Sequence, residues 1–440
     1  MSKISQIWTT IVEAFGENIN VLAREMNVIQ RQSKITGQAL TQGLVFTFLA
    51  TPQAREVEVA QGVGCAGATV TAQAVNAKLT EGTARFLKTV LERMVQMKTR
   101  RSGPTQRILD RFSMVNVHDS TSIGLPDELS HIWQGCGNCT EHAKAGIKLQ
   151  VQWDLRQGTL EMLTLHDGRA QDRSAPVQTA VVQAGSLRLA DLGYFDLSSF
   201  QRIGAAGAYW LTRYLPRVIV YTADKVKLDL PDWLANNCTD EVRVDMPVLL
   251  GATDMLPARM IAVRVPQWVA DGRRRRLYDD AISKAQAVSP ISLILADWSI
   301  FLTNAPLDLL SASEVLIVAH ARWQIELLFK LWKSCGRIDA SRSQKPYRIL
   351  CEFYAKLIGQ VIQHWLIVHV SWSVPDRSMT KVAAAIRSVA RALLTALNNP
   401  SSSQGDVLIA TVQMLVVPTC RINRRNVKPA LFQQLDTFDA

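Results

Sequence analysis

The sequence predicts an α/β protein in which a mixed β-sheet core with a β-rich insertion is flanked by an N-terminal helical domain and by C-terminal helices. Three observations predict this class. Apolar residues recur at helical spacing through the first hundred residues, short apolar or alternating strands follow, and helical spacing returns towards the C-terminus. We place the domains at 1–104, 105–345 and 346–440, with the insertion at about 206–289.

The N-terminal domain is predicted to be helical. Leu79–Val95 repeats Leu, Phe and Val at the spacing of an amphipathic helix. Lys98–Gln106 is basic and contains Ser-Gly-Pro, which is typical of a linker.

The core begins with four predicted strands. Phe112–Asp119 is apolar and β-branched, and Ser186–Phe195 is a short apolar strand. Ile147–Leu155 and Thr159–Gly168 flank an Arg-Gln-Gly turn, which predicts a hairpin.

Further strands and helices complete the core. The block 217–266 is rich in strand signals and forms the predicted insertion. Arg273–Gln286 is predicted to be a basic helix and Leu293–Asn304 a strand. A helix capped by Ser311 or Ser313 follows and runs to about residue 334.

The charge balance favours a polyanionic partner. Lys+Arg minus Asp+Glu is 49 − 38 = +11, and nucleic acid is the commonest partner of such a chain. Basic residues cluster at Arg273–Arg276 and again between Arg421 and Lys428. A solvated basic surface that aids solubility explains the same charge equally well.

The sequence has the features of a cytosolic protein. Seven cysteines in 440 residues do not form a disulfide scaffold, and the N-terminus lacks the apolar stretch of a signal peptide. The longest apolar segment, Tyr354–Trp372, is interrupted by Lys356 and His364, so we expect a core helix and not a membrane span.

Three carboxylates form the candidate catalytic set. Asp119 and Asp191 each end a predicted strand, where sites tend to form, and Glu326 lies in the middle of the helix His320–Ser334. Taken singly, an aspartate at a strand end is usually a turn residue.

Basic residues surround the glutamate on its helix. Arg322, Glu326, Lys330 and Lys333 are four, four and three residues apart, which places them on one helix face. Such a face is usually an exposed ladder of ion pairs. In the functional interpretation, two Mg²⁺ ions about 4 Å apart use the carboxylate oxygens in phosphodiester exchange, and the basic residues hold DNA phosphates.

Longer segments strengthen the functional interpretation. Val117–Leu129, Leu189–Asp196 and Leu302–Ser334 resemble the DDE transposases of bacterial insertion sequences, and most closely the cut-and-paste branch that forms DNA hairpins. That branch carries the pattern Tyr-x2-Arg-x3-Glu-x6-Lys on its glutamate helix. Arg322, Glu326 and Lys333 fit the pattern, whereas Ala319, next to His320, stands at the tyrosine position.

The resemblance implies a fold, a reaction and partners. The implied fold is a ribonuclease-H-like core interrupted by the β-rich insertion. The implied enzyme is a Mg²⁺-dependent nuclease and strand transferase, with Mn²⁺ able to substitute and with Asp119, Asp191 and Glu326 as metal ligands. Its partners are double-stranded DNA, namely the terminal inverted repeats and the target, and a second copy of the chain, with no membrane. Its location is the bacterial cytosol, at the nucleoid.

The resemblance also implies DNA-binding residues. Trp298 lies where the branch places an aromatic ring that stacks on a flipped base; an ordinary strand tryptophan is the equal alternative. Arg273, Arg274, Arg275 and Arg276 are predicted backbone contacts. The helical domain, with Arg24, Arg31, Lys34, Arg100 and Arg101, is expected to bind the terminal repeats.

Alternative functions remain at this point. The chain could be a ribonuclease-H-like nuclease that cuts without joining, or a DNA-binding relic that has lost activity. A zinc site built from His131, Cys136, Cys139 and His142 is the weaker interpretation of a segment that we expect to be a loop. Asp167 and Asp172 are expected to shape a turn.

Overall fold

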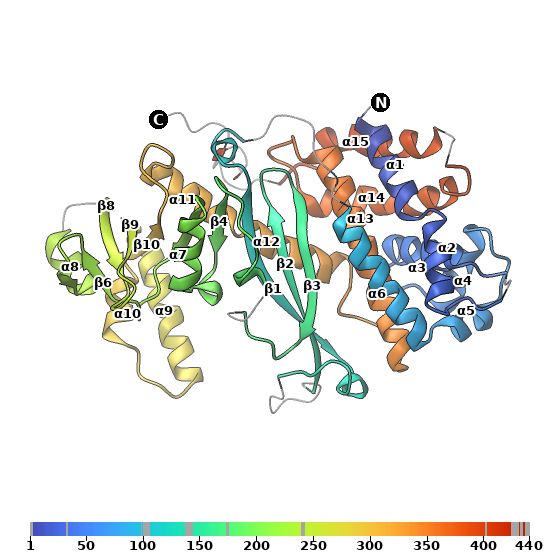
Figure 1. Cartoon of the computed structure of the whole chain (residues 1–440), viewed down its shortest axis with the longest axis horizontal. Coiled ribbons are helices and arrows are strands. Elements are labelled where there is room, and N and C mark those ends of the chain that lie inside the picture. The colour runs from blue at the N-terminus through green and yellow to red at the C-terminus, as the bar shows by residue number, and fades with distance from the viewer. Residues whose placement is uncertain are drawn as a thin grey trace. The chain divides into compact units, whose positions relative to one another are not determined.

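The computed structural model describes residues 3–31, 34–97, 99, 106–136, 144–172, 176–238, 243–400, 403–423, 431 and 434–435 (Figure 1). The chain forms two compact units, each assembled from separate segments. Unit 1 contains Met1–Thr105, Ser120–Ala170 and Gln324–Gln433, and unit 2 contains Gln106–Asp119, Gln171–Trp323 and Gln434–Ala440.

Unit 1 is mainly helical. Its helices are α1 (Lys3–Ala14), α2 (Asn18–Glu25), α3 (Gly37–Ala50), α4 (Glu56–Cys65), α5 (Ala72–Lys78), α6 (Glu81–Gln96), α12 (Gln324–Lys330), α13 (Pro346–Ser371), α14 (Met379–Ala396) and α15 (Gln404–Thr419). Threonines begin several of them: the hydroxyl of Thr80 accepts the backbone N–H of Thr83 at the start of α6. The predicted helices of the first hundred residues are confirmed.

Helix α13 forms the centre of unit 1. It is buried over nearly its whole length and packs against α3, α6, α14 and α15 (Figure 1). The polar residues that interrupt its apolar run are buried and bonded: the ammonium of Lys356 pairs with Glu352 at 2.8 Å. The expectation of a core helix is therefore confirmed. Within the described residues, no helix combines the length and the apolar character needed to cross a membrane.

A strand hairpin packs on this helical unit. Strands β2 (Ala145–Asp154) and β3 (Thr159–Asp167) are antiparallel, as predicted. Gly158 adopts φ +76° in the turn, a conformation that favours glycine. Its carbonyl accepts a 2.6 Å hydrogen bond from Nε2 of His364 on α13.

Unit 2 contains most of the remaining strands. They are β4 (Leu187–Ala190), β5 (Tyr209–Arg213), β6 (Val220–Thr222), β7 (Lys227–Leu228), β8 (Arg243–Leu250), β9 (Leu256–Arg264) and β10 (Trp298–Thr303). Strand β1 (Val115–Leu125) contributes its first half to unit 2 and its second half to unit 1. The strand order is β3-β2-β1 in unit 1 and β1-β4-β5-β10-β9-β8-β6-β7 in unit 2.

The strand directions give a mixed sheet. Strand β4 is parallel to β1 and β5 is parallel to β4, whereas the strands from β5 through β10, β9 and β8 to β6 and β7 pair antiparallel. This matches the predicted ribonuclease-H-like class, with β6 to β9 as the predicted β-rich block. The block also contains a helix, α8 (Leu230–Asn237), that strand signals alone did not predict.

The other helices of unit 2 are α7 (Leu197–Ala205), α9 (Gln267–Ser283), α10 (Pro290–Leu295) and α11 (Ala312–Ala321). Ser311 caps α11 in a capping box with Glu314, so the first of the two predicted caps is the correct one. The Glu314 carboxylate also accepts two hydrogen bonds from Arg111, at 2.7 and 3.0 Å. The start of α11 is thus fixed to the segment that precedes β1.

One predicted strand is partly wrong. Leu293–Asn304 was expected to be a single strand, but its first residues belong to α10 and β10 starts at Trp298. Pro290 explains the difference, because its fixed φ and missing N–H suit the first turn of a helix.

Candidate active site

Asp119 and Asp191 lie on neighbouring parallel strands. Val115 pairs with Leu187 and Val117 with Leu189, so the same register continued by two residues brings Asp119 beside Asp191 on one sheet face. The prediction that Asp191 ends a strand is off by one residue, because β4 ends at Ala190. The predicted strand Ser186–Phe195 stops there because a 3₁₀ helix follows at Leu192–Tyr194. The prediction that Asp119 ends a strand is wrong, because β1 continues to Leu125 and its later residues have β2 as a neighbouring strand.

A single arginine bridges the two aspartates. The guanidinium of Arg322 lies 3.6 Å from Oδ2 of Asp119 and 3.6 Å from Oδ1 of Asp191. The Arg322 side chain is only 15% exposed. Such proximity to two carboxylates lowers their mutual repulsion, so the pair can be held together in a partly buried place.

Arg213 is a further member of this cluster that the sequence did not reveal. Its guanidinium lies 3.6 Å from Oδ1 of Asp191, and its side chain is 59% exposed. The β4–β5 register explains the contact, because Ala190 pairs with Thr212 and the next residues are Asp191 and Arg213. The register of a parallel pair cannot be read from the sequence, which is why Arg213 was missed.

A buried layer supports the aspartates. His118 precedes Asp119, and its ring lies 6.4 Å from the ring of Tyr194, which belongs to the 3₁₀ helix η5 (Leu192–Tyr194) just after Asp191. Burial, together with the positive charge of Arg188, lowers the pKa of His118 well below its usual value. The histidine is therefore neutral and packs as part of the core.

Glu326 lies in the first turn of α12, in unit 1. The predicted continuous helix from 311 to 334 is wrong. The N–H groups of Arg322 and Trp323 bond to the carbonyls three residues earlier, a tighter turn that ends α11 before α12 begins. Glu326 therefore stands at a helix start, and Arg322 belongs to the end of the preceding helix.

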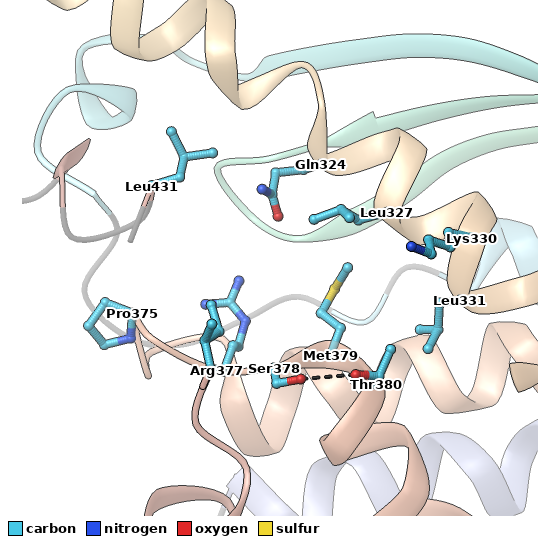
Figure 2. A pocket seen from close by; sticks show the side chains of 11 residues that line it. Gln324, Leu327, Lys330, Leu331, Pro375, Arg377, Ser378, Met379, Thr380 and Leu431 are labelled. Atoms are coloured by element: carbon cyan, nitrogen blue, oxygen red, sulfur yellow. Dashed lines mark hydrogen bonds between the residues drawn. The ribbon is translucent and has the colours of Figure 1, made fainter. Parts of the chain in front are cut away.

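The two lysines that follow Glu326 are in different environments. Lys330 is exposed at the end of α12, where it lines a cavity of about 240 Å³ with Gln324, Leu327 and Met379 (Figure 2). Lys333 belongs to a π-helical turn, η6 (Leu331–Cys335), and its ammonium donates to the carbonyl of Ser122 at 2.8 Å. On the same segment Ile325, Leu328 and Leu331 are buried, so its apolar residues face the core.

Trp298 is the first residue of β10 and is 5% exposed. Its ring is covered by the guanidinium of Arg264, 5.0 Å from the ring centroid. The cross-strand register places Phe301 beside Arg213, so strand alternation turns Trp298 to the sheet face opposite that of Arg213 and Asp191. Its role in base stacking stays a prediction, and it requires that the ring be uncovered.

The four arginines of α9 are not equivalent. Arg273 donates to the carbonyl of Trp298 and the hydroxyl of Ser299, both at 2.8 Å. Arg274 pairs with Asp297 at 2.6 Å and with Asp271 at 3.2 Å. Arg275 and Arg276 are exposed.

The chemistry of the aspartate pair fits a divalent cation. Oδ1 of Asp191 is a buried atom that accepts no hydrogen bond from the described residues, and carboxylate oxygens are the ligands that Mg²⁺ prefers. Within the described ranges, no three acidic, histidine or cysteine side chains gather as a metal site. Metal binding by Asp119, Asp191 and Glu326 together therefore stays a prediction.

Other sequence features are only partly described. Cys139 and His142 lie outside the described residues, as do Arg100 and Arg101. Cys136 is exposed, and its thiol donates to the carbonyl of Gly168 at 3.4 Å. Asp167 accepts the backbone N–H of Gln134, in keeping with a role in shaping a loop.

Comparisons with known proteins identify the family. The model described as the transposase DDE domain matches residues 110–361. The transposase for insertion sequence element IS231F of Bacillus thuringiensis subsp. israelensis is 26% identical over 366 residues, covering 78% of this chain and 76% of that protein. The transposase for IS1151 of Clostridium perfringens is 21% identical over 389 residues, with coverages of 83% and 81%.

A solved structure, the cryo-EM synaptic complex of piggyBac transposase with hairpin DNA, has a TM-score of 0.47 and 9% identity, covering 96% of this chain and 87% of that one. The family assignment comes from the sequence, because the family model for the transposase DDE domain matches more than half of this chain. The chain therefore belongs to the DDE transposase family, whose members include these insertion-sequence transposases.

Proposed function

We propose that this transposase binds the terminal inverted repeats of an insertion sequence, cuts phosphodiester bonds there with the help of divalent metal ions, and joins the freed ends to target DNA. The observation that carries the proposal is the pairing of Asp119 and Asp191 by Arg322, at 3.6 Å from each carboxylate. Two carboxylates gathered around one partly buried guanidinium are the kind of charged cluster that is common at functional sites.

The proposed metal ligands are Asp119, Asp191 and Glu326. When bound, Mg²⁺ or Mn²⁺ supplies the Lewis acidity that activates the attacking oxygen and stabilises the leaving oxygen. Before metal binding, Arg322 balances the charge of the aspartates. In the DNA complex its planar guanidinium is suited to bind a phosphate through two parallel hydrogen bonds.

The proposed reaction has four steps. Water cuts one strand at the element's end and frees a 3′-hydroxyl. That hydroxyl attacks the opposite strand and forms a hairpin, a second water opens the hairpin, and the freed end attacks the target. Two ends must be joined, so the working form is a homodimer. The setting is the bacterial cytosol, at the nucleoid.

A cleavage assay tests this function. The substrate is DNA that carries the inverted repeats flanking the reading frame, incubated with the full chain and Mg²⁺. We expect nicked, hairpin and joined products on a denaturing gel. End binding without metal-dependent nicking would identify a DNA-binding relic, and nicking without joined products would identify a nuclease.

Substitutions of the carboxylates test the site. Asp119→Asn, Asp191→Asn and Glu326→Gln remove a charge with little change in shape. We expect each to reduce nicking by at least about a thousandfold, or ~4 kcal/mol of transition-state stabilisation, with nearly unchanged end binding. Asp224→Asn, at an exposed residue beside β6, is the matched control. Normal nicking by any of the three variants would remove that residue from the proposed site.

A further inference from the structure

A row of side chains crosses four strands of unit 2 on the face that carries the aspartates. Asp119 and Asp191 lie side by side in the β1–β4 register, and Asp191 lies beside Arg213 in the β4–β5 register. Arg213 in turn pairs with Phe301 on β10. Alternation along β10 puts Ser299 on this same face, diagonal to Arg213.

Helix α9 extends this row. The guanidinium of Arg273 donates to the hydroxyl of Ser299 at 2.8 Å, and therefore reaches the face on which Arg213 lies. Its pKa is lowered by burial and then by the positive charges of Arg213 and Arg276. Arg213 and Arg276 therefore each lie close enough to Arg273 for their charges to act on it.

These three arginines carry a charge that the protein itself balances poorly. Arg213 faces the already bridged Asp191. Arg273 bonds to neutral oxygens, and Arg276 bonds to the carbonyl of Gly272 on its own helix. Among the described side chains, no carboxylate forms an ion pair with Arg273 or Arg276. Adjacent cations of this kind are favourable when an anion binds them.

Arg274 differs from these three. It pairs with Asp271 and with both oxygens of Asp297, which fixes the start of β10 to α9. Its charge is therefore neutralised within the protein. Among the four consecutive arginines, Arg274 is therefore the one whose charge is paired with carboxylates of the protein.

An aromatic ring lies within the same surface. Phe301 is partly exposed, and its register partner is Arg213. Guanidinium groups beside a partly exposed ring form a pattern that binds a nucleic-acid strand, because phosphates contact the cations while a base stacks on the ring. From β4 to β10 the surface spans about 10 Å, or two strand spacings.

We propose that Arg213, Phe301, Arg273 and Arg276 form a track that binds the DNA strand flanking the scissile phosphate and leads it to Asp119 and Asp191. The proposal rests on the proposed transposase function and adds to it the path of the bound strand. The same surface explains why the exposed Arg213 lies next to an aspartate of the catalytic set.

Binding measurements test the track. Two probes are compared by fluorescence anisotropy over a series of salt concentrations: a terminal-repeat duplex with a short single-stranded flank, and the same duplex without the flank. Arg213→Gln and Arg276→Gln should each weaken binding of the flanked probe and reduce its salt slope by about one unit. Phe301→Leu, which keeps an apolar side chain, should weaken it about fivefold or more.

Controls keep the interpretation clear. Lys227→Gln removes one exposed charge from the edge strand β7 and should leave both probes unaffected. If Arg213→Gln, Arg276→Gln and Phe301→Leu bound the flanked probe with the affinity and salt slope of the wild type, the proposed track would be wrong. If the wild-type protein fails to cut DNA while the arginine variants still lose flank binding, the track stands and the catalytic proposal fails.

Discussion

At the scale of single residues, the central feature is the guanidinium that separates two carboxylates. Arg322 occupies the place between Asp119 and Asp191 that a bound cation would compete for. The aspartate pair is therefore stabilised by an internal cation, and the proposed metal ions would compete with it for the same carboxylates.

Replacement of this arginine should change the response to metal. Without divalent ions, Arg322→Gln should lower the free energy of unfolding by about 1 kcal/mol, because the carboxylates lose their partner. Added Mn²⁺ should then raise the melting temperature of Arg322→Gln more than that of the wild type, since no guanidinium competes for the aspartates. Differential scanning fluorimetry measures both effects. Arg217→Gln, at an exposed arginine of unit 2, is the control and should behave like the wild type. If Mn²⁺ raised the melting temperature of Arg322→Gln no more than that of the wild type, Arg322 would not compete with the metal.

The sequence revealed only some residues of this cluster. Arg322 was predicted from its four-residue spacing to Glu326 and from a family pattern. Arg213 was not, because its contact with Asp191 depends on which residues of β4 and β5 face each other. Trp298 could be placed on a strand, but the face to which it points depends on where β10 starts.

At the scale of elements, the boundaries decide where the chemistry lies. The chain passes from unit 2 to unit 1 directly after Asp119 and again directly after Trp323, three residues before Glu326. The segment that carries the family pattern is therefore not one helix: it breaks between Arg322, at the end of α11, and Glu326, in the first turn of α12. The period of apolar residues predicts helix on both sides of the break, and nothing in that period indicates the tighter turn at Arg322 and Trp323.

The contact between α13 and the β2–β3 turn should make the fold sensitive to acid. Burial lowers the pKa of His364 to about 4, against the opposing effect of its bond to Gly158. The unfolded chain binds this proton below about pH 6.5, whereas the folded chain stays neutral to about pH 4. The free energy of unfolding should therefore fall by up to about 3 kcal/mol as the pH drops through this window, and be constant above it.

Urea unfolding at several pH values measures this effect. His364→Gln keeps a donor for the carbonyl of Gly158 and removes the titrating ring, so its stability should depend less on pH between about 6.5 and 4. His131→Gln, at an exposed histidine, should keep the wild-type profile. A His364→Gln profile parallel to that of the wild type would assign the acid sensitivity to other groups, such as the buried His118.

At the scale of the whole molecule, the net charge of +11 and the family assignment point to a complex with DNA. We expect the protein to pair two ends. With DNA that carries one terminal repeat, size-exclusion chromatography with light scattering should give a complex of two chains and two DNA molecules. Completion of end joining by a complex with a single chain would contradict this stoichiometry.

Local patterns in the sequence were enough to predict the class of the protein. Apolar periods, turn residues and caps act over a few positions, so the helical first hundred residues, the β2–β3 hairpin, the core helix α13 and the β-rich block could all be predicted. The spacing of Arg322, Glu326 and Lys333 likewise indicated the family. The strand register, which brings Asp119, Asp191 and Arg213 onto one face, is known only from the folded molecule. The same is true of the breaks that end α11 and form the π-turn. Register and breaks depend on contacts between segments far apart in the chain, and no local pattern encodes them.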